Sequence, residues 1–344
     1  MFTEAELLNA AEKQLEGLFR KPIRAKHVRR PNNGPDKILR AGKYLFVVEA
    51  KSSNRLASIH RACEQARAYA QKESPGAIPL VVVPFMGPSG REACDEAKVS
   101  FVDAAGNAHI EAPGLLVHVE GKPNRSPAPG RPSSVFAPRS SRVARQMLLD
   151  PQRWWRQKDL ADKTRLGRGF ISRIVARLAE DGLLDRSDDG EVRPSDPDLL
   201  LDAWKDEYEF RRHHIIAGHT PARSGEELAG RIADAADRYG HEYAFTGLPA
   251  AAALAPFAAF RLAAAYFREH PSDGFLESLG FHAGERGANT WLILPADDGV
   301  FDGAKEVRGR TCVSAVQAYL DLLHMPERAN EAAEHLREVC LKWR

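Results

Sequence analysis

The pattern of apolar and polar residues predicts an opening helix followed by alternating strands and helices. Residues 3–19 carry leucine and alanine at helical spacing, with Thr3 and Glu6 placed as a capping box. The nearly unbroken apolar run from Tyr44 to Val48 is typical of a strand covered on both faces. Similar patterns predict a helix over 56–72, strands over 78–85 and 99–106, and a helix near 91–97. We therefore expect a parallel or mixed α/β sheet over residues 1–120.

The next stretch, residues 121–142, is rich in Pro, Ser and Arg and shows no helical or strand period. This composition is typical of a partly extended linker. Because the linker is cationic, it can either be solvated or lie along nucleic-acid phosphates. Its basic residues are Lys122, Arg125, Arg131, Arg139 and Arg142.

Residues 143–196 predict three helices and a hairpin, the latter around Asp188-Asp189-Gly190. Helix, helix, turn, helix and hairpin is the order of a winged helix-turn-helix, whose third helix enters the DNA major groove. A winged helix that dimerises, with its arginines merely solvated, is the alternative. The residues that we expect at DNA are Arg168, Ser172, Arg173 and Arg177 on the third helix, and Arg186 and Arg193 on the hairpin.

Residues 197–344 predict a C-terminal α+β domain. A strand is expected at 291–294, residues 312–323 fit a strand or the start of a helix, and a last helix is expected to begin at Pro326. The alanine-rich stretch from Leu248 to Phe267 contains Arg261, so we expect a buried helix rather than a membrane span. We interpret Asp297-Asp298-Gly299 as a hairpin turn rather than a metal-binding pair. The histidines His213, His214, His219 and His241 lack an established metal-ligand spacing.

Composition and charge narrow these expectations only slightly. The 344 residues suggest two or three domains, and 43% apolar with 28% charged residues is typical of a soluble globular protein. The net charge of +2 means that any basic surface must arise from segregated charge. The four cysteines show no metal-binding spacing, and the N-terminus lacks a signal-peptide pattern. We therefore expect a cytoplasmic protein that does not associate with membranes.

The candidate catalytic residues are Asp36, Glu49 and Lys51. Because side chains alternate along a strand, Glu49 and Lys51 point to the same face where the strand ends. Hydrolysis of a phosphodiester needs a metal ion, and Mg²⁺ prefers carboxylate oxygens such as those of Asp36 and Glu49. A neighbouring lysine can orient the attacking water and stabilise the charged transition state. A salt-bridged Glu/Lys pair without catalytic function is the structural alternative.

The arrangement of Pro35-Asp36, twelve further residues and Glu49-Ala50-Lys51 resembles the signature of the PD-(D/E)xK nuclease superfamily. The resemblance implies a restriction-endonuclease-like mixed sheet flanked by helices. It also implies that Asp36 and Glu49 bind Mg²⁺ or Mn²⁺ and that Lys51 is the catalytic lysine. Further matches to the family pattern are an acidic residue on the first helix, Glu12 or Glu16, and on the helix after the motif Gln65, with Tyr69 one turn later.

Three short motifs resemble the type IV abortive-infection (AbiEi) antitoxins. They are FVDAAGNA at 101–108, YAFTGL at 243–248 and VSAVQAYLDLL at 313–323. This resemblance implies a winged helix that represses its own operon and a C-terminal domain that counters a nucleotidyltransferase toxin. The α/β domain in front departs from the short family pattern.

Two functional hypotheses follow. The first is a divalent-metal-dependent DNA endonuclease of a defence or mobile-element system, directed to DNA by its winged helix. The second is a non-catalytic transcriptional regulator or antitoxin with a toxin partner protein. Both predict a DNA-binding protein whose affinity falls with salt. A homodimer is plausible under either hypothesis because winged helices often read paired half-sites.

Overall fold

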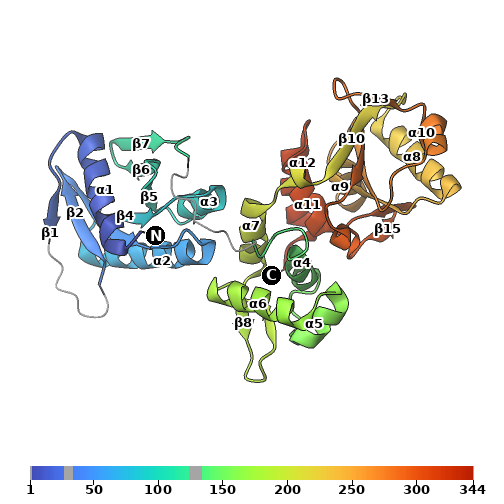
Figure 1. Cartoon of the computed structure of the whole chain (residues 1–344). Helices are drawn as coiled ribbons and strands as arrows, with labels where there is room; N and C mark the ends of the chain where they lie inside the picture. Colours follow the sequence, from blue (N-terminus) through green and yellow to red (C-terminus); the bar gives the residue numbers. More distant parts are fainter. Residues whose placement is uncertain (1, 27–33, 124–133, 344) are drawn as a thin grey trace. The chain divides into compact units, whose positions relative to one another are not determined.

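The computed structural model describes residues 2–26, 34–123 and 134–343. The chain forms two compact units. Unit 1 comprises Met1–Ser133 and Leu178–Leu183, and unit 2 comprises Ser134–Arg177 and Leu184–Arg344. Helices and mixed sheets occur together in this structure, so the predicted mixed α/β class is confirmed at that level (Figure 1).

A seven-stranded mixed sheet forms the centre of unit 1, with its strands in chain order. The strands are β1 (Arg24–Lys26), β2 (Lys37–Ala41), β3 (Tyr44–Ala50), β4 (Ile78–Val83), β5 (Ser100–Asp103), β6 (Ala108–Ala112) and β7 (Leu115–Val119). Strands β3, β4 and β5 run parallel, and all other neighbouring pairs run antiparallel. The parallel strands are joined by helices because a parallel pair needs a crossover connection.

Helices cover both faces of this sheet (Figure 1). On one face, α1 (Glu4–Phe19) shares an apolar cluster with Phe46 and other even-numbered residues of β3. On the other face, α2 (Leu56–Glu73) and α3 (Pro88–Glu96) cluster with Val81 of β4. The odd-numbered side chains of β3 therefore point toward the α2 face, since alternate residues of a strand face opposite ways.

The start of α1 has the predicted capping box. Thr3 Oγ1 accepts a hydrogen bond from Glu6 N at 3.3 Å, and Thr3 N donates to Glu6 Oε2 at 2.8 Å. Thr3→Ala removes this acceptor, so we expect it to lower the free energy of unfolding by about 1 kcal/mol. Urea denaturation followed by circular dichroism measures the change, with Thr3→Ser, which keeps the hydroxyl, as the control. An unchanged midpoint for Thr3→Ala would mean that the cap contributes nothing.

Four short strands of this sheet, β1, β2, β6 and β7, were not predicted. Strands β1 and β2 lie in basic or mixed stretches of three to five residues, which are too short to show a period. Strands β6 and β7 are joined by a turn at Pro113 and Gly114, where Gly114 has a φ of 75°. That Pro-Gly pair between apolar runs is the sequence signal that would have indicated the hairpin.

Residues 141–194 form the three helices and the hairpin that their pattern predicts, and we call them the helix–hairpin segment. Its elements are α4 (Ser141–Leu149), α5 (Gln157–Thr164), α6 (Arg168–Glu180), β8 (Leu184–Arg186) and β9 (Val192–Pro194). Strands β8 and β9 pair antiparallel, and Trp155 adds a bridge to Val192. Ile171 and Val175 on α6 are fully buried, as the apolar stripe predicts.

A second seven-stranded mixed sheet lies in the C-terminal part of unit 2, in the order β13-β10-β14-β12-β11-β16-β15. Its strands are β10 (His214–His219), β11 (Tyr243–Thr246), β12 (Ala263–Phe267), β13 (His282–Ala283), β14 (Thr290–Leu294), β15 (Lys305–Val307) and β16 (Arg310–Cys312). The helices of this part are α7 (Pro197–Glu207), α8 (Gly225–Tyr239), α9 (Gly247–Leu254), α10 (Asp273–Leu279), α11 (Ala315–Leu322) and α12 (Ala329–Cys340), with 3₁₀ turns at Phe210–Arg212 and Asp298–Phe301. Residues 312–323 thus resolve into a strand end followed by a helix.

Two predicted helices of this part are corrected. The single buried helix expected from Leu248 to Phe267 is wrong, because α9 ends at Leu254 and β12 begins at Ala263. Pro256 explains the break, since the position before a proline disfavours helical backbone. The last helix begins at Ala329 rather than at Pro326. Among the described residues, no helix has both the length and the apolar character needed to cross a membrane.

The predicted linker, residues 121–142, is described only in part, and Arg125 and Arg131 lie outside the described residues. Beyond this gap Phe136 is buried and stacks on Trp204 of α7 at a centroid distance of 6.3 Å. The part after residue 133 is therefore packed within unit 2 rather than extended in solvent.

Arg142, counted with the linker by sequence, lies in α4 and forms an ion pair. Its guanidinium donates hydrogen bonds of 2.6 and 2.9 Å to the two oxygens of Asp297. Asp297 also caps the 3₁₀ turn by accepting from Gly299 N at 2.8 Å. The hairpin turn expected at Asp297-Asp298-Gly299 is therefore wrong. The sequence could not show this pairing because its partners are 155 residues apart.

Candidate active site and DNA-binding surface

The β2–β3 hairpin brings Asp36 and Glu49 together at one end of the sheet. Lys37 pairs with Val48 in the ladder, so the next pair outward is Asp36 with Glu49. Two hydrogen bonds fix this end: Asp36 N donates to Val48 O at 3.1 Å, and Ala50 N donates to Asp36 Oδ2 at 2.9 Å. The spacing of twelve residues in the sequence is therefore the length of the hairpin that folds the two acids onto each other.

Lys51 completes this group. Its Nζ lies 3.0 Å from Glu49 Oε2, and its backbone N donates to Val82 O of the parallel strand β4 at 2.9 Å. The carboxyl end of β3 thus remains tied to the sheet while the two charged side chains point toward the α2 face. The side chain of Glu49 is 4% exposed and that of Lys51 is 22% exposed. We call Asp36, Glu49 and Lys51 the acid–lysine site.

Burial and two charged neighbours affect the ionisation of Glu49 in the acid–lysine site. Burial raises the pKa of Glu49, and the nearby charge of Asp36 raises it further. The hydrogen bond and charge of Lys51 act in the opposite direction. Carboxylate oxygens such as those of Asp36 and Glu49 suit Mg²⁺ or Mn²⁺. The donor set therefore fits a divalent ion held by Asp36 and Glu49 with water as the remaining ligands.

The other residues matched to the nuclease pattern have different environments. Glu12 on α1 forms an ion pair of 2.5 Å with the Nζ of Lys37, the residue that follows Asp36 in the chain. Glu16 is exposed and accepts from Ile23 N at 3.3 Å, so it is less suited to the site. Gln65 lies on α2 with its Oε1 buried and without a hydrogen-bond partner. Tyr69, one turn further, is half-buried.

In the part of the chain that the structure describes, no three or more His, Cys, Asp or Glu side chains gather as a metal site. The acid–lysine site supplies two carboxylates, which is the usual protein contribution to a Mg²⁺ ion that keeps several waters and binds substrate phosphate.

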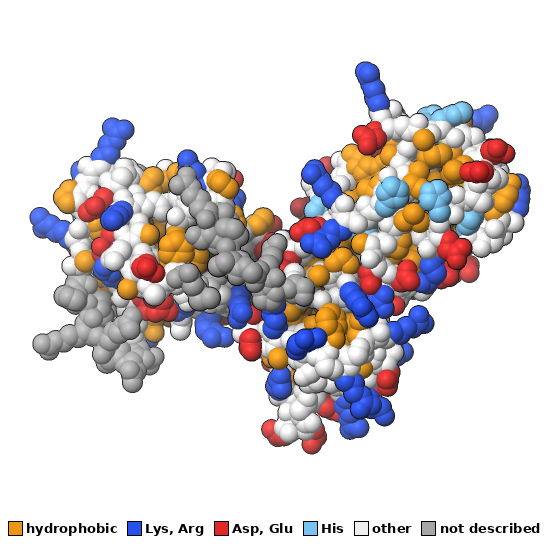
Figure 2. Space-filling model, viewed as in Figure 1, with side chains coloured by type: hydrophobic (Ala, Val, Ile, Leu, Met, Phe, Trp, Pro, Cys, Tyr) orange, Lys and Arg blue, Asp and Glu red, His pale blue; other side chains and the backbone are white. Residues whose placement is uncertain are grey.

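The predicted DNA-binding residues differ in exposure. Arg168, Ser172 and Arg173 on α6 and Arg186 on β8 are exposed. Arg173 lies 5.8 Å from the ring of Phe170. Figure 2 shows Lys and Arg side chains over the elements α5 and α6. These positions leave the first two turns of α6 free to present polar groups, as recognition of a DNA groove requires.

Two of the predicted arginines are instead engaged within the protein. Arg193 stacks on Trp154 at 4.4 Å and lies 3.8 Å from Asp185 Oδ2 across the hairpin. Arg177 is half-buried. Trp155 is 2% exposed, so it packs inside the protein.

Unit 2 also contains a buried polar network that sequence reasoning missed. The carboxylate of Asp321 on α11 accepts hydrogen bonds from the side chains of Thr246, Tyr266, Gln317 and Tyr208. Gln317 Oε1 accepts from Nη2 of the buried Arg145 on α4 at 2.5 Å. The network therefore links the helix–hairpin segment to the C-terminal sheet within unit 2. No sequence signal reveals it, because Arg145 and Gln317 are 172 residues apart.

His213 belongs to the same network rather than to a histidine metal cluster. Its Nδ1 accepts from Ala296 N at 3.1 Å, so the ring proton resides on Nε2, which faces Tyr208 Oη at 3.0 Å. Burial and the charge of Arg145 lower the pKa of His213 to about 4. Burial raises the pKa of Asp321 to about 6. Between about pH 4 and 6 both groups are therefore mainly uncharged.

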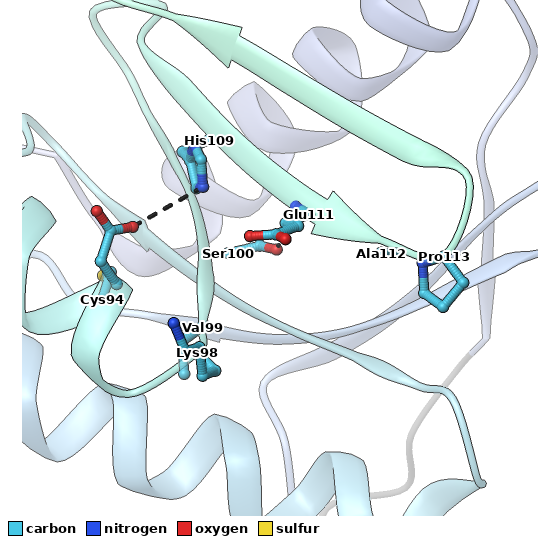
Figure 3. Close-up of a pocket in the computed structure, with 9 residues that line it drawn as sticks. Cys94, Lys98, Val99, Ser100, His109, Glu111, Ala112 and Pro113 are labelled. Carbon is cyan, nitrogen blue, oxygen red and sulfur yellow. Dashed lines mark hydrogen bonds and ion pairs between the residues drawn. The ribbon is translucent and has the colours of Figure 1, made fainter.

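A separate pocket of about 750 Å³ opens beside α3 in unit 1 (Figure 3). Its lining includes the charged or titratable side chains of Asp95, Lys98, His109 and Glu111, and not those of the acid–lysine site. Figure 3 shows His109 on β6 directed toward the end of α3.

In comparisons with known proteins, no protein-family model, no curated protein and no solved structure matches the chain.

Proposed function

We propose that the chain is a DNA-binding protein whose unit 1 cleaves DNA phosphodiesters with a divalent metal ion. The observation that carries the proposal is the acid–lysine site, in which a hairpin brings Asp36 beside the buried Glu49 and the strand end adds Lys51 at 3.0 Å. The charge of Asp36 raises the pKa of Glu49, and a shared metal ion would offset this repulsion between the two acids.

Each residue of the site has a role that its surroundings suit. Asp36 and Glu49 would hold Mg²⁺ or Mn²⁺, which when bound neutralises the phosphate and lowers the pKa of a bound water. Asp36 is oriented for this by the hydrogen bond from Ala50 N. Lys51 is partly exposed, so its ammonium can leave Glu49, hold the attacking water and stabilise the extra negative charge on the phosphate.

We further propose that the helix–hairpin segment acts as a winged helix-turn-helix that delivers DNA to this site. The exposed Arg168 and Arg173 lie on the first turns of α6, and the hairpin follows that helix as a wing. Phosphate contacts from such arginines supply most of the affinity of a DNA-binding module.

The nuclease function is tested by incubating the purified chain with supercoiled and linear DNA in Mg²⁺ or Mn²⁺. We expect nicked and linear products that are abolished by EDTA and restored by excess Mn²⁺. Cleavage in EDTA, or no cleavage of duplex, single-stranded or nicked DNA with either metal, would overturn the proposal.

Replacing Arg173 with alanine is expected to weaken DNA binding by about tenfold or more, because an arginine at a base edge or phosphate contributes about 1–3 kcal/mol. Fluorescence anisotropy at several salt concentrations measures the affinity and the salt slope. Arg286→Ala, which removes an exposed arginine outside the segment, is the matched control and should bind as the wild type. Equal losses in both variants would indicate general charge attraction rather than an interface on α6.

The second candidate function is a non-catalytic regulator or antitoxin with the same DNA-binding segment. The pairing of Lys51 with Glu49 favours it, since this ion pair satisfies both groups without a metal. It predicts tight binding to the chain's own promoter as a dimer on paired half-sites, inhibition of a toxin encoded beside it, and no cleavage of any DNA.

A further inference from the structure

A cross-strand histidine pair lies at the edge of the unit 1 sheet. His109 of β6 and His118 of β7 are directly opposite each other in the ladder. Their Nδ1 atoms lie 3.1 Å apart, with the rings at 82° to each other. Phe101 of β5 stacks on the His109 ring at a centroid distance of 6.3 Å, which limits how that ring turns. The side chain of His118 is 55% exposed, so the pair is open to solvent.

The outer nitrogen of each ring faces a carboxylate. His109 Nε2 lies 3.8 Å from Asp95 Oδ1 at the end of α3, and His118 Nε2 lies 3.5 Å from Glu120 Oε1. Arg91 holds Glu120 in place with a contact of 3.0 Å. A carboxylate near Nε2 favours the tautomer that carries its proton there. Without a metal, one Nδ1 donates a hydrogen bond to the other. Once that proton is released and both rings carry their proton on Nε2, the two Nδ1 lone pairs face the same space and can bind one cation.

We propose that His109 and His118 bind a first-row transition-metal ion such as Zn²⁺, Ni²⁺ or Cu²⁺ through their Nδ1 atoms. Imidazole nitrogens prefer these ions to the hard Mg²⁺. With metal–nitrogen bonds of about 2.05 Å, nitrogens 3.1 Å apart subtend about 98° at the metal, between octahedral and tetrahedral values. The carboxylates behind the rings then have the orienting function that is usual for metal-bound histidines.

The surroundings leave room for the remaining ligands. His109 also lines the pocket of about 750 Å³ beside α3. Since no third His, Cys, Asp or Glu joins the pair among the described residues, water or a group from a bound molecule completes the coordination. The site is independent of the acid–lysine site, which has only oxygen ligands and selects a different class of metal.

Calorimetric titration of the untagged, metal-stripped full chain with Ni²⁺ and Zn²⁺ tests the proposal. We expect one equivalent to bind near neutral pH, to persist in excess Mg²⁺ and to be lost at about pH 5 as protons compete for the imidazoles. His118→Ala should abolish this binding. Glu120→Gln, which keeps both ligands, should weaken it by about tenfold or more.

The chain offers a matched control in His219 and His282, which are also exposed cross-strand neighbours, on β10 and β13. The double variant His219→Ala with His282→Ala should keep the binding unchanged. Binding that survives His118→Ala, that vanishes in the control variant, or that is absent from the wild type would overturn the proposal. Circular dichroism of each variant shows whether the fold is kept, and Glu120→Gln decides the question should His118→Ala unfold.

Discussion

Lys51→Met is expected to lower the rate of metal-dependent DNA cleavage by about 10²–10³-fold while leaving DNA affinity unchanged. The loss follows from removing the Lys51 ammonium, and positioned charges of this kind contribute that much to a transition state. Methionine replaces the apolar stem of lysine and lacks only the terminal ammonium, so it keeps most of the packing of the strand end. Single-turnover cleavage at saturating protein measures the chemical step apart from binding.

Asp36→Asn should give a different signature at the same site. The amide keeps an oxygen that can accept from Ala50 N but loses the charge that attracts the metal. We therefore expect a higher Mg²⁺ requirement together with a lower maximal rate, and a lower pKa for Glu49, whose charge Asp36 otherwise opposes. Titrating the cleavage rate with Mg²⁺ and Mn²⁺ separates the two effects.

Arg40→Met is the matched control for both variants, because Arg40 is an exposed basic residue of β2 in the same hairpin. It should cleave as the wild type. If Lys51→Met and Asp36→Asn cleave at the wild-type rate, the acid–lysine site is not catalytic and any nuclease activity arises elsewhere. If no variant, including the wild type, cleaves DNA while binding persists, the regulator hypothesis is favoured.

Asp321→Asn is expected to change how the stability of unit 2 depends on pH. The pKa of Asp321 is raised from 3.8 to about 6 by burial, so folding favours its protonated form. Its contribution to stability is fully present below about pH 4 and is lost as the pH rises to about 6. This loss lowers the free energy of unfolding by about 3 kcal/mol. The variant cannot ionise and loses this dependence.

The ionisation of His213 changes the stability of unit 2 in the opposite direction over nearly the same pH range. Its pKa is lowered from 6.5 to about 4 by burial and by Arg145, so folding favours the neutral ring. That contribution is present above about pH 6.5 and is lost as the pH falls toward 4, again by about 3 kcal/mol. In the wild type the two changes therefore largely cancel between pH 4 and 6.5.

Replacing Asp321 and His213 one at a time separates their two contributions to the pH dependence of stability. Relative to the wild type, Asp321→Asn should become more stable as the pH rises from 4 to 6.5, and His213→Gln should become less stable over the same interval. Urea denaturation at several pH values, expressed as the difference from the wild type, cancels the contributions of the other carboxylates. If the curves of unfolding free energy against pH are parallel for the wild type and both variants, neither group has a pKa that differs between the folded and unfolded states.

Much of the local structure is determined by short-range sequence patterns. The first helix was predictable from its leucine spacing and capping box, and β3 from the apolar run after Tyr44. The helix–hairpin segment followed from three amphipathic patterns and the Asp-Gly turn at residues 189–190. The sequence predicts these elements because helix caps, turns and amphipathic faces involve residues only a few positions apart.

The long alanine-rich stretch shows where these signals fail. Residues 248–267 are rich in alanine throughout, yet the first part is helical and Ala263–Phe267 is the fully buried centre of a sheet. Neighbouring strands β11 and β14 decide that difference, and periodicity cannot tell a buried strand from a buried helix.

By itself, the sequence determined which residues could form the acid–lysine site, because Asp36, Glu49 and Lys51 are marked by type and spacing. Only the tertiary structure decided that the hairpin folds the two acids together and that Glu49 is buried. It alone paired Arg145 with Gln317 and placed His109 opposite His118. Those contacts depend on strand register and on packing between distant segments, which the chain establishes only once its apolar faces are buried together.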